Sequence, residues 1–209
     1  MSTGRAEAFS DGVFAVAITV LVFGLLPIGT RTLNTHVLLQ AWPEYFAYVV
    51  SFLTIGIMWM NHHTILAHVV RVDRPLLVIN LLLLMGIVAI PFPTALVAEH
   101  LRNSGGKLAT VTYGLVMIAI SAGFAALWVY VATHAAALGA ALPPQALRSS
   151  IPGWTLGGVA YLAGTLIAGL VSAVAGMVIF GALGVYYLFE HLPSPAEEAP
   201  GSSASEPGP

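Results

Sequence analysis

The stretch RAEAFSDGVFAVAITVLVFGLL, residues 5–26, decides the fold of this chain. It is long enough and apolar enough to cross a bilayer as one helix. Its polar groups are Arg5, Glu7, Ser10 and Asp11 at the entrance and Thr19 near the middle. A charged side chain in a spanning helix has a high free-energy cost, so it needs a partner inside the protein or a helix face in contact with water. The stretch therefore indicates a helix that lines an ion path and is held in place by the other helices.

Helical spacing places a narrow stripe of residues along this segment. At about 100° per residue, Gly12, Val16, Thr19 and Phe23 fall on one face. Asp11 lies about 110° from the centre of that stripe, so it would point sideways toward a neighbouring helix. The same stripe is also typical of a packing surface, and a threonine in a membrane often bonds to its own helix. Periodicity alone therefore does not decide whether the stripe lines a pore or packs against another helix. Asp11 is equally a candidate for a structural ion pair.

Composition places the chain among all-α integral membrane proteins. Of its 209 residues, 58% are hydrophobic and 8% are charged, and the mean hydropathy is +0.90. The formal net charge of −2 provides no basic patch for nucleic acid. The absence of cysteine excludes disulfides and thiolate chemistry. No GxSxG motif and no cysteine nucleophile occur, so neither an enzyme nor a bound cofactor is predicted.

The apolar runs predict one membrane domain, residues 1–191, with six spanning helices. Pro91 and Pro93 should kink or end the regular hydrogen bonding in the third of them. Residues 30–39 and 142–150 are predicted as loops, and the Pro/Ser/Glu/Gly-rich residues 192–209 as a disordered tail. The predicted spans are about 5–27, 42–68, 76–98, 108–137, 154–171 and 174–189.

Two further patterns concern topology and packing. Six spans put both termini on one side of the membrane, and the Lys/Arg distribution makes that side cytoplasmic. The basic residues there are Arg5, Arg71, Arg74 and Arg148, against Arg31, Arg102 and Lys107 on the other side. Small residues recur every fourth position at Ala160, Gly164, Ala168 and Ser172, which predicts a close helix-packing face.

The histidines at the end of the second span favour hydrogen bonding over metal binding. His62 and His63 are adjacent, so they point about 100° apart and do not form the i, i+4 pair of zinc helices. If spans one to three meet at this end, the side chains of spans two and three can hydrogen-bond to Ser10 and Asp11. The candidates are His62 or His63, together with Asn61 and Asn80. Such donors would satisfy a buried carboxylate.

The sequence TVTYG at residues 110–114 differs by one letter from the TVGYG filter of ordinary potassium channels. The third position of that filter is a glycine, which tolerates unusual backbone angles, whereas this chain has Thr112. The stretch also opens a predicted spanning helix. We therefore predict the start of a helix here and no filter built from backbone carbonyls.

The segment Arg5-x-x-x-Phe9-Ser10-Asp11 resembles the RxxxFSD signature of the prokaryotic branch of the transmembrane protein 175 potassium channel family. The likeness continues through GVFAVAIT. It also includes Trp59-x-x-His62-His63 in the second span and Asn80 with PFPT in the third. It covers roughly the first hundred residues, whereas the later spans match only in number and character.

This resemblance implies a homotetramer of six-helix subunits in the plasma membrane of a prokaryote, with four copies of the first helix around a central pore. Apolar side-chain rings would gate the pore, at Val16 and more widely at Phe23. Permeant K⁺ would pass near a layer of Thr19 hydroxyls. The residues expected to brace the first three helices are Arg5, Phe9, Ser10, Asp11, Trp59, His62, His63 and Asn80. Val16 is smaller than the Ile or Leu common in the family and Phe23 replaces an aliphatic residue, so either ring is a candidate for the tightest point.

The predicted function is a modestly selective potassium channel that opens and closes by wetting and dewetting of apolar rings. A proton-coupled secondary transporter that uses Asp11 and His63 as a relay is the alternative. It would show inverted repeats with paired broken helices, whereas only the third span has a Pro break. A non-conducting structural membrane protein is a third possibility.

Overall fold

The computed structural model describes residues 3–29, 34–141 and 143–189. Every regular element in these ranges is a helix, as predicted. The predicted tail, residues 192–209, lies outside the described residues. The elements are α1 (Thr3–Val20), η1 (Leu21–Leu25), α2 (Leu26–Gly29), α3 (Thr35–Gln40), α4 (Trp42–Ala67), α5 (Arg74–Ala89), α6 (Pro91–His100), α7 (Gly106–Thr133), α8 (Ala135–Leu138), α9 (Pro144–Ser149), α10 (Ile151–Leu170) and α11 (Ala173–Phe189).

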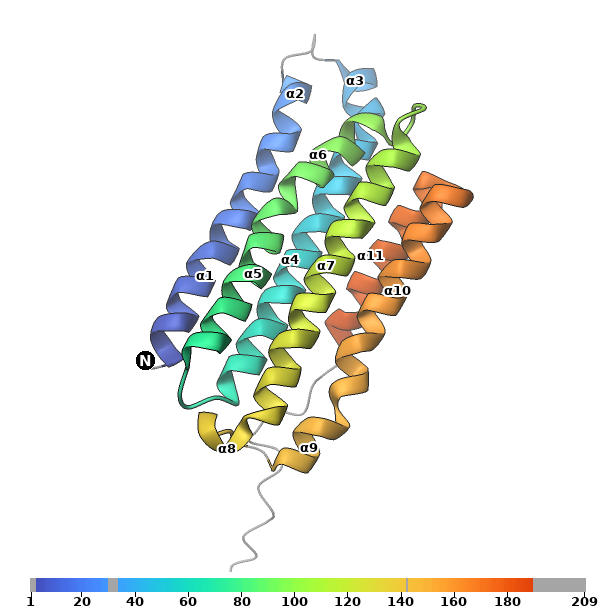
Figure 1. The fold of residues 1–209 in the computed structure, drawn as a ribbon. Coiled ribbons are helices and arrows are strands. Elements are labelled where there is room, and N and C mark those ends of the chain that lie inside the picture. The colour runs from blue at the N-terminus through green and yellow to red at the C-terminus, as the bar shows by residue number, and fades with distance from the viewer. Residues whose placement is uncertain (1–2, 30–33, 142, 190–209) are drawn as a thin grey trace, which may run out of the picture.

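The helices form an up-and-down bundle, with consecutive long segments running in opposite directions (Figure 1). We call the end where Thr3 and α9 lie the lower end, and the end where α2 and the α6–α7 turn lie the upper end, as drawn there. Five segments in the described ranges are long and apolar enough to cross a membrane, and α11 is a shorter apolar helix. The five are residues 3–29, 42–67, 74–100, 106–133 and 145–170.

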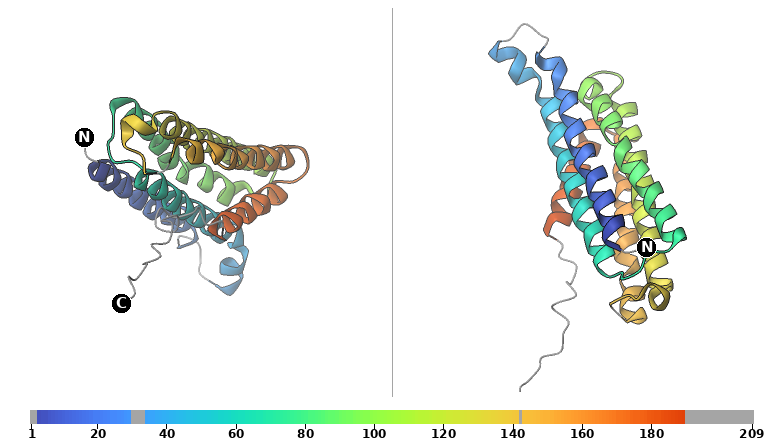
Figure 2. Two further views of the ribbon diagram at one scale, coloured as in Figure 1. Left: turned by 90° about the horizontal axis from the view of Figure 1, so that it is seen from below. Right: turned by 90° about the vertical axis from the view of Figure 1, so that its left-hand side faces the viewer.

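Helix α7 forms the centre of the bundle and α1 lies at its edge. α7 packs mainly against α5, α6, α10 and α11, whereas α1 packs mainly against α4 and α5. Figure 2 shows this arrangement from below, with α1 and α10 far apart. The TVTYG stretch lies inside α7, where Tyr113 and Gly114 are buried, so the prediction of a helix without a carbonyl filter is confirmed at these residues.

Two segments predicted as loops contain short helices. Asn34 caps α3, because its side-chain oxygen accepts a hydrogen bond of 2.9 Å from the Val37 amide. Helix α9 has Pro144 in its first turn, a position that needs no hydrogen-bond donor. The loop predictions for residues 35–39 and 144–149 are therefore wrong, because residue types that favour turns here begin helices. The fourth span also ends earlier than predicted, at Thr133, and α8 follows it.

The proline break predicted in the third span is confirmed. Helix α5 ends at Ala89 and α6 begins at Pro91, with Ile90 as the junction. The two helices continue in the same general direction after a bend (Figure 1). Because proline lacks an amide hydrogen, the regular ladder cannot continue through Pro91 and Pro93.

Small residues bring α10 and α11 into close contact, as the four-residue repeat predicted. A Cβ atom on Gly164 would lie 2.6 Å from Cε1 of Phe180. A Cβ atom on Gly176 would lie 3.0 Å from Cα of Ala168. Side chains at either position would therefore force the two backbones apart.

The α4–α5 turn ties together the lower ends of several helices. The Thr3 hydroxyl donates to the Val69 carbonyl oxygen at 2.9 Å, and the Arg71 amide donates to the Leu138 carbonyl oxygen at 3.0 Å. Asp73 caps α5 by accepting from the Leu76 amide at 3.0 Å, and it also accepts from the Tyr130 hydroxyl at 2.6 Å. Partial burial raises the pKa of Asp73, but the hydrogen bonds from Tyr130 and Leu76 outweigh it and hold that pKa below its ordinary value.

Candidate ion-conduction surface

The outer face of α1 is apolar and exposed. Its buried side consists of Ala6, Ser10, Phe14 and Ala17, which pack toward the bundle. At about 100° per residue, the stripe through Gly12, Val16 and Thr19 lies on roughly the opposite face. Val16 is 58% exposed in the protomer. The packing alternative for this stripe is therefore not realised within one protomer.

Thr19 bonds to its own helix and still faces outward. Its hydroxyl donates to the Val16 carbonyl oxygen at 2.9 Å. This bond uses the single hydrogen of Thr19 and leaves its oxygen lone pairs as acceptors. An oxygen that presents only lone pairs to the exposed face suits contact with a cation.

Phe23 departs from the direction that α-helical spacing assigns to it. Residues Leu21–Leu25 form the 3₁₀ helix η1, in which each residue advances about 120°. Over the three steps from Val20, Phe23 is therefore rotated about 60° further than in an α-helix. It remains 61% exposed but lines a cavity of about 490 Å³ between η1, α4 and α6. The structure thus separates Phe23 from the line through Val16 and Thr19.

The second and third spans brace α1 through a buried hydrogen-bonded chain. His62 Nε2 donates to Asn80 Oδ1 at 2.7 Å, and Asn80 Nδ2 donates to Ser10 Oγ at 3.0 Å. All three side chains are buried, and the His62 ring also packs against Phe14 at 5.4 Å between centroids. These hydrogen bonds join α1, α4 and α5 at the depth where the sequence predicted such a contact.

Asp11 takes a different partner from the one predicted. Trp59 Nε1 donates to Asp11 Oδ1 at 2.8 Å, while His63 stacks on the Trp59 ring at 6.3 Å between centroids. Asp11 and His63 are both exposed in the protomer. The expectation that a buried Asp11 bonds to His62, His63, Asn61 or Asn80 is therefore wrong. The indole of Trp59 is longer than an imidazole and reaches from α4 to α1.

The remaining predicted bracing residues lie outside this network. Arg5 and Phe9 are exposed on α1, and Phe9 is 55% exposed. Asn61 points to the other side of α4, where it lines a cavity of about 360 Å³ with residues of α7 and α10. Among the described residues, no three His, Asp or Glu side chains gather as they would around a metal ion.

Sequence reasoning missed a cluster of buried hydroxyls in the centre of the bundle. Ser51 Oγ lies 2.8 Å from Thr94 Oγ1 and donates to the Tyr113 hydroxyl at 3.2 Å. The signal was present as Ser51 and Thr54, which lie one helical turn apart within the apolar second span. Their partners come from α6 and α7, so the cluster becomes visible only in the folded chain.

Comparison with known proteins identifies the family. A family model described as endosomal/lysosomal potassium channel TMEM175 matches residues 5–91. A protein of Streptomyces collinus described as a potassium channel is 43% identical over 202 residues, which cover 94% of this chain and 97% of that protein. A potassium channel of Chamaesiphon minutus is 44% identical over 135 residues, 63% of this chain and 66% of that protein.

The fold agrees with these matches. The crystal structure of a lysosomal potassium-selective channel TMEM175 homolog from Chamaesiphon minutus superposes with a TM-score of 0.76 and 33% identity. The match covers 89% of this chain and 96% of that one. Because the similarity runs through α1 and extends over nearly the whole chain, the chain belongs to the TMEM175 family of potassium channels.

Proposed function

We propose that this chain conducts K⁺ passively across a membrane through a central pore formed by four copies of α1. The observation that carries the proposal is the exposed stripe of Gly12, Val16 and Thr19 on the face of α1 that turns away from its own bundle. One helix cannot enclose a pore, so the stripe needs copies of itself around a shared axis. Family membership and relatives described as potassium channels support K⁺ as the permeant ion.

Val16 is the proposed constriction, with Thr19 beside it. A ring of valines excludes water when the helices are close and admits it when they separate. K⁺ passes more readily than Na⁺ because it gives up its hydration shell at a lower cost, and the lone pairs of Thr19 replace part of that shell. Because the stripe carries no charged side chain, the expected selectivity is modest. Phe23, rotated toward α4 and α6, forms a wider outer ring.

The hydrogen-bonded chain from Ser10 through Asn80 to His62 holds α1 at a fixed rotation. Without it, the buried side of α1 at this depth would be held only by apolar contacts, which are not directional. The Trp59–Asp11 bond lies next to the exposed face of α1, where a neighbouring subunit would pack. The network therefore sets which side chains face the pore axis.

The proposed topology has six spans, the sixth formed by α11, and both ends of the domain in the cytoplasm. The lower end contains the first turn of α1, the α4–α5 turn with Arg71, the start of α5 at Arg74, and α9 with Arg148 (Figure 1). Arg102, in the turn after α6, and Lys107, in the first turn of α7, lie at the upper end. An excess of positive residues marks the cytoplasmic side, which assigns the lower end to it. The bacterial relatives support the plasma membrane as the location.

The coupled-transporter alternative has less support, because Trp59 and not His63 bonds to Asp11. The deciding experiment is to place purified protein in planar bilayers under opposed K⁺ and Na⁺ gradients and to read the reversal potential. Ohmic unitary currents with a reversal potential displaced toward that of K⁺ support the channel. Saturable flux driven by a pH gradient, or no flux at all, would reject it.

A further inference from the structure

A cavity of about 360 Å³ lies at the lower end of the protomer, between α4, α7, α10 and α11. We call it the lower cavity. Its deep walls include Ile57, Met58, Phe124 and Tyr161, none of which is more than 7% exposed. Ser149 of α9 also lines it and is exposed, so the lower cavity opens beside α9. Its volume lies within the range of about 300–1,000 Å³ that is typical of small-molecule sites.

The polar groups on the wall of the lower cavity are all neutral. Among the described residues that line it, the polar side chains are hydroxyls, an amide, a phenol and an indole, and none carries a formal charge. A charged ligand would lose its hydration there without gaining an opposite charge. Asn61 on α4 and Ser121 on α7 can each donate and accept a hydrogen bond. The wall therefore suits an uncharged molecule with one or two polar groups.

Aromatic rings make up one side of the lower cavity. The Trp154 ring stacks on Phe124 and on Trp128, with centroid distances of 6.1 Å and 5.2 Å. Phe124 and Trp154 both line the cavity, and Tyr161 lines it further along α10. A planar ring packs well against such side chains through offset or edge-to-face contacts, and the thioether of Met58 on the α4 wall also favours ring edges.

Trp154 carries a hydrogen-bond donor without an acceptor. Its Nε1 atom is buried and has no hydrogen-bond partner within the described part of the chain. The neighbouring indole differs, because Trp128 Nε1 donates to the Leu147 carbonyl oxygen at 3.1 Å and to Ser150 Oγ at 3.0 Å. A buried indole N–H is normally paired, since leaving it unpaired destabilises the fold. A carbonyl oxygen on a molecule in the lower cavity would supply the missing acceptor.

Glycines keep the lower cavity open. A Cβ atom on Gly153 would meet nothing within 4 Å. A Cβ atom on Gly184 would lie 3.7 Å from Thr54 Oγ1 and 3.9 Å from Ile57 Cδ1, which are ordinary contact distances to two side chains of the wall. Gly176 differs, because a Cβ there would lie 3.0 Å from the backbone of α10. Close helix approach therefore does not require glycine at 153 or 184, and the space beside them stays free.

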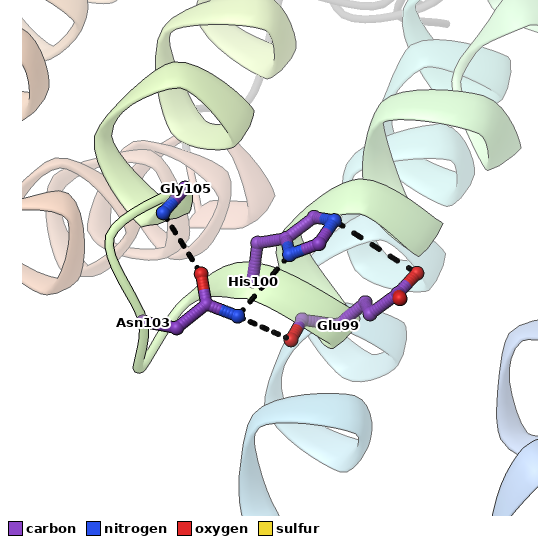
Figure 3. Close-up of polar contacts among 4 residues, drawn as sticks. All are labelled: Glu99, His100, Asn103 and Gly105. Atoms are coloured by element: carbon purple, nitrogen blue, oxygen red, sulfur yellow. Dashed lines mark hydrogen bonds and ion pairs between the residues drawn. The ribbon is translucent and has the colours of Figure 1, made fainter.

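The cavity of about 490 Å³ at the upper end does not suit the same kind of molecule. Glu44 and Glu99 both line it. At its rim the Glu99 carboxylate is 3.9 Å from His100 Nε2, and the Asn103 amide donates to His100 Nδ1 at 3.2 Å (Figure 3). A neutral aromatic ligand would displace water from these carboxylates, at a free-energy cost that the lower cavity does not impose.

We propose that the lower cavity binds a small, uncharged, planar aromatic molecule that carries a carbonyl group. The ring packs against Met58 and Tyr161, and the carbonyl oxygen accepts a hydrogen bond from Trp154 Nε1. Asn61 pairs with a further polar group of the ligand. Neither pore-stripe residue, Val16 or Thr19, lines the lower cavity, so this site is separate from the proposed K⁺ path.

The probe is 4-fluorobenzamide, a neutral aromatic amide, added to the full chain in lipid nanodiscs. Fluorine NMR line broadening measures its binding, and empty nanodiscs give the background from partition into lipid. An excess of unfluorinated benzamide should displace the probe, whereas hexanamide, which has the same amide on an aliphatic chain, should displace it at least about tenfold less well. The measurement involves no ion flux, so its outcome does not depend on the K⁺ channel proposal.

Two variants remove the space. Gly184→Leu fills the lower cavity from α11 and Gly153→Leu fills it from α10, so each should weaken probe binding at least about tenfold. Thr155→Leu is the matched control, because Thr155 is exposed on α10 and does not line the cavity. Circular dichroism establishes that each variant keeps its helical content.

A third variant removes the donor. Trp154→Phe keeps an aromatic ring and loses the N–H group, so the probe should bind about five- to tenfold more weakly, as expected for one lost hydrogen bond. Trp42→Phe is the control, since Trp42 begins α4 at the upper end and is 40% exposed. It should bind the probe as the wild type does.

Three results would overturn the proposal. The first is broadening in the wild type no greater than with empty nanodiscs. The second is wild-type affinity in Gly184→Leu and Gly153→Leu with their helical content intact, or in Trp154→Phe. The third is equal displacement by hexanamide and benzamide, which would assign the lower cavity to aliphatic chains such as those of lipids.

Discussion

Trp59 and Asp11 are joined by a hydrogen bond of 2.8 Å from the indole nitrogen to the carboxylate, across 48 positions of the chain. The bond lies beside the exposed face of α1, and Trp59 remains 42% exposed in the protomer. A second subunit packed on this face would reduce the exposure of both groups to water. The contact is therefore placed to affect both the attachment of α1 and the association of subunits.

Trp59→Phe and Asp11→Asn should each lower the fraction of the proposed tetramer in detergent. Either change weakens the bond by about 1 kcal/mol, and the double variant should be little worse than each single one because the partners share one interaction. Size-exclusion chromatography with light scattering measures the tetramer fraction. His36→Ala, at an exposed position on α3, serves as the control. Strictly additive losses would show that the two residues act independently.

Asn80→Ala should destabilise the fold by about 1–3 kcal/mol, because it leaves the buried His62 and Ser10 without their partner. The expected result is a lower midpoint of thermal unfolding in detergent, as measured by circular dichroism. Asn103→Ala, in the exposed α6–α7 turn, removes the same amide at the surface and should cost much less. Equal midpoints for the two variants would contradict the bracing role of the Ser10–Asn80–His62 chain.

Val16→Asn should increase leak and reduce selectivity for K⁺ over Na⁺, because a polar ring remains wet when the helices are close. Phe23→Asn should have a smaller effect, since Phe23 is rotated toward the cavity between α4 and α6. Liposome flux and bilayer reversal potentials measure both quantities. If Phe23→Asn raises the leak and Val16→Asn does not, the constriction is at Phe23.

Asp73 should make the fold less stable in acid. Its pKa is lowered in the folded chain, so its contribution to stability is complete above the pKa of the unfolded chain and is lost as pH falls through the folded value. Tyr130→Phe removes one of the two hydrogen bonds to Asp73 and should reduce this acid-dependent loss. Thermal midpoints measured from neutral pH down to about pH 3 in both proteins provide the comparison. Identical pH profiles would rule out this role for the bond between them.

Gly176→Ala should lower the unfolding midpoint by the equivalent of about 1–3 kcal/mol, because the added methyl would collide with Ala168 and force α10 and α11 apart. Gly56→Ala is the matched control, since a Cβ at Gly56 in α4 would meet nothing within 4 Å. That change should be neutral or slightly stabilising, as alanine favours helix over glycine. A neutral Gly176→Ala would show that the α10–α11 contact is looser than in this structure.

Several features could be predicted from the sequence because they depend on neighbours along the chain. Apolar runs determine where the long helices lie, and Pro91 and Pro93 determine where the third span bends. Helical spacing also places Val16 and Thr19 on one face of α1, since the segment through Val20 is a regular α-helix. Prediction from the sequence fails at Asn34 and Pro144, where residue types that usually form turns instead begin short helices.

The tertiary structure decided which groups meet. Asp11 bonds to Trp59 and not to a histidine, because the rotation and separation of α1 and α4 select the side chain that can reach. The 3₁₀ turn rotates Phe23 out of line with Val16, a change that no repeat in the sequence marks. The cluster of buried hydroxyls joins Ser51 to Thr94 and Tyr113 over 43 and 62 positions. Sequence spacing sets which face a residue occupies on its own helix, whereas the packing of whole helices sets what that face contacts.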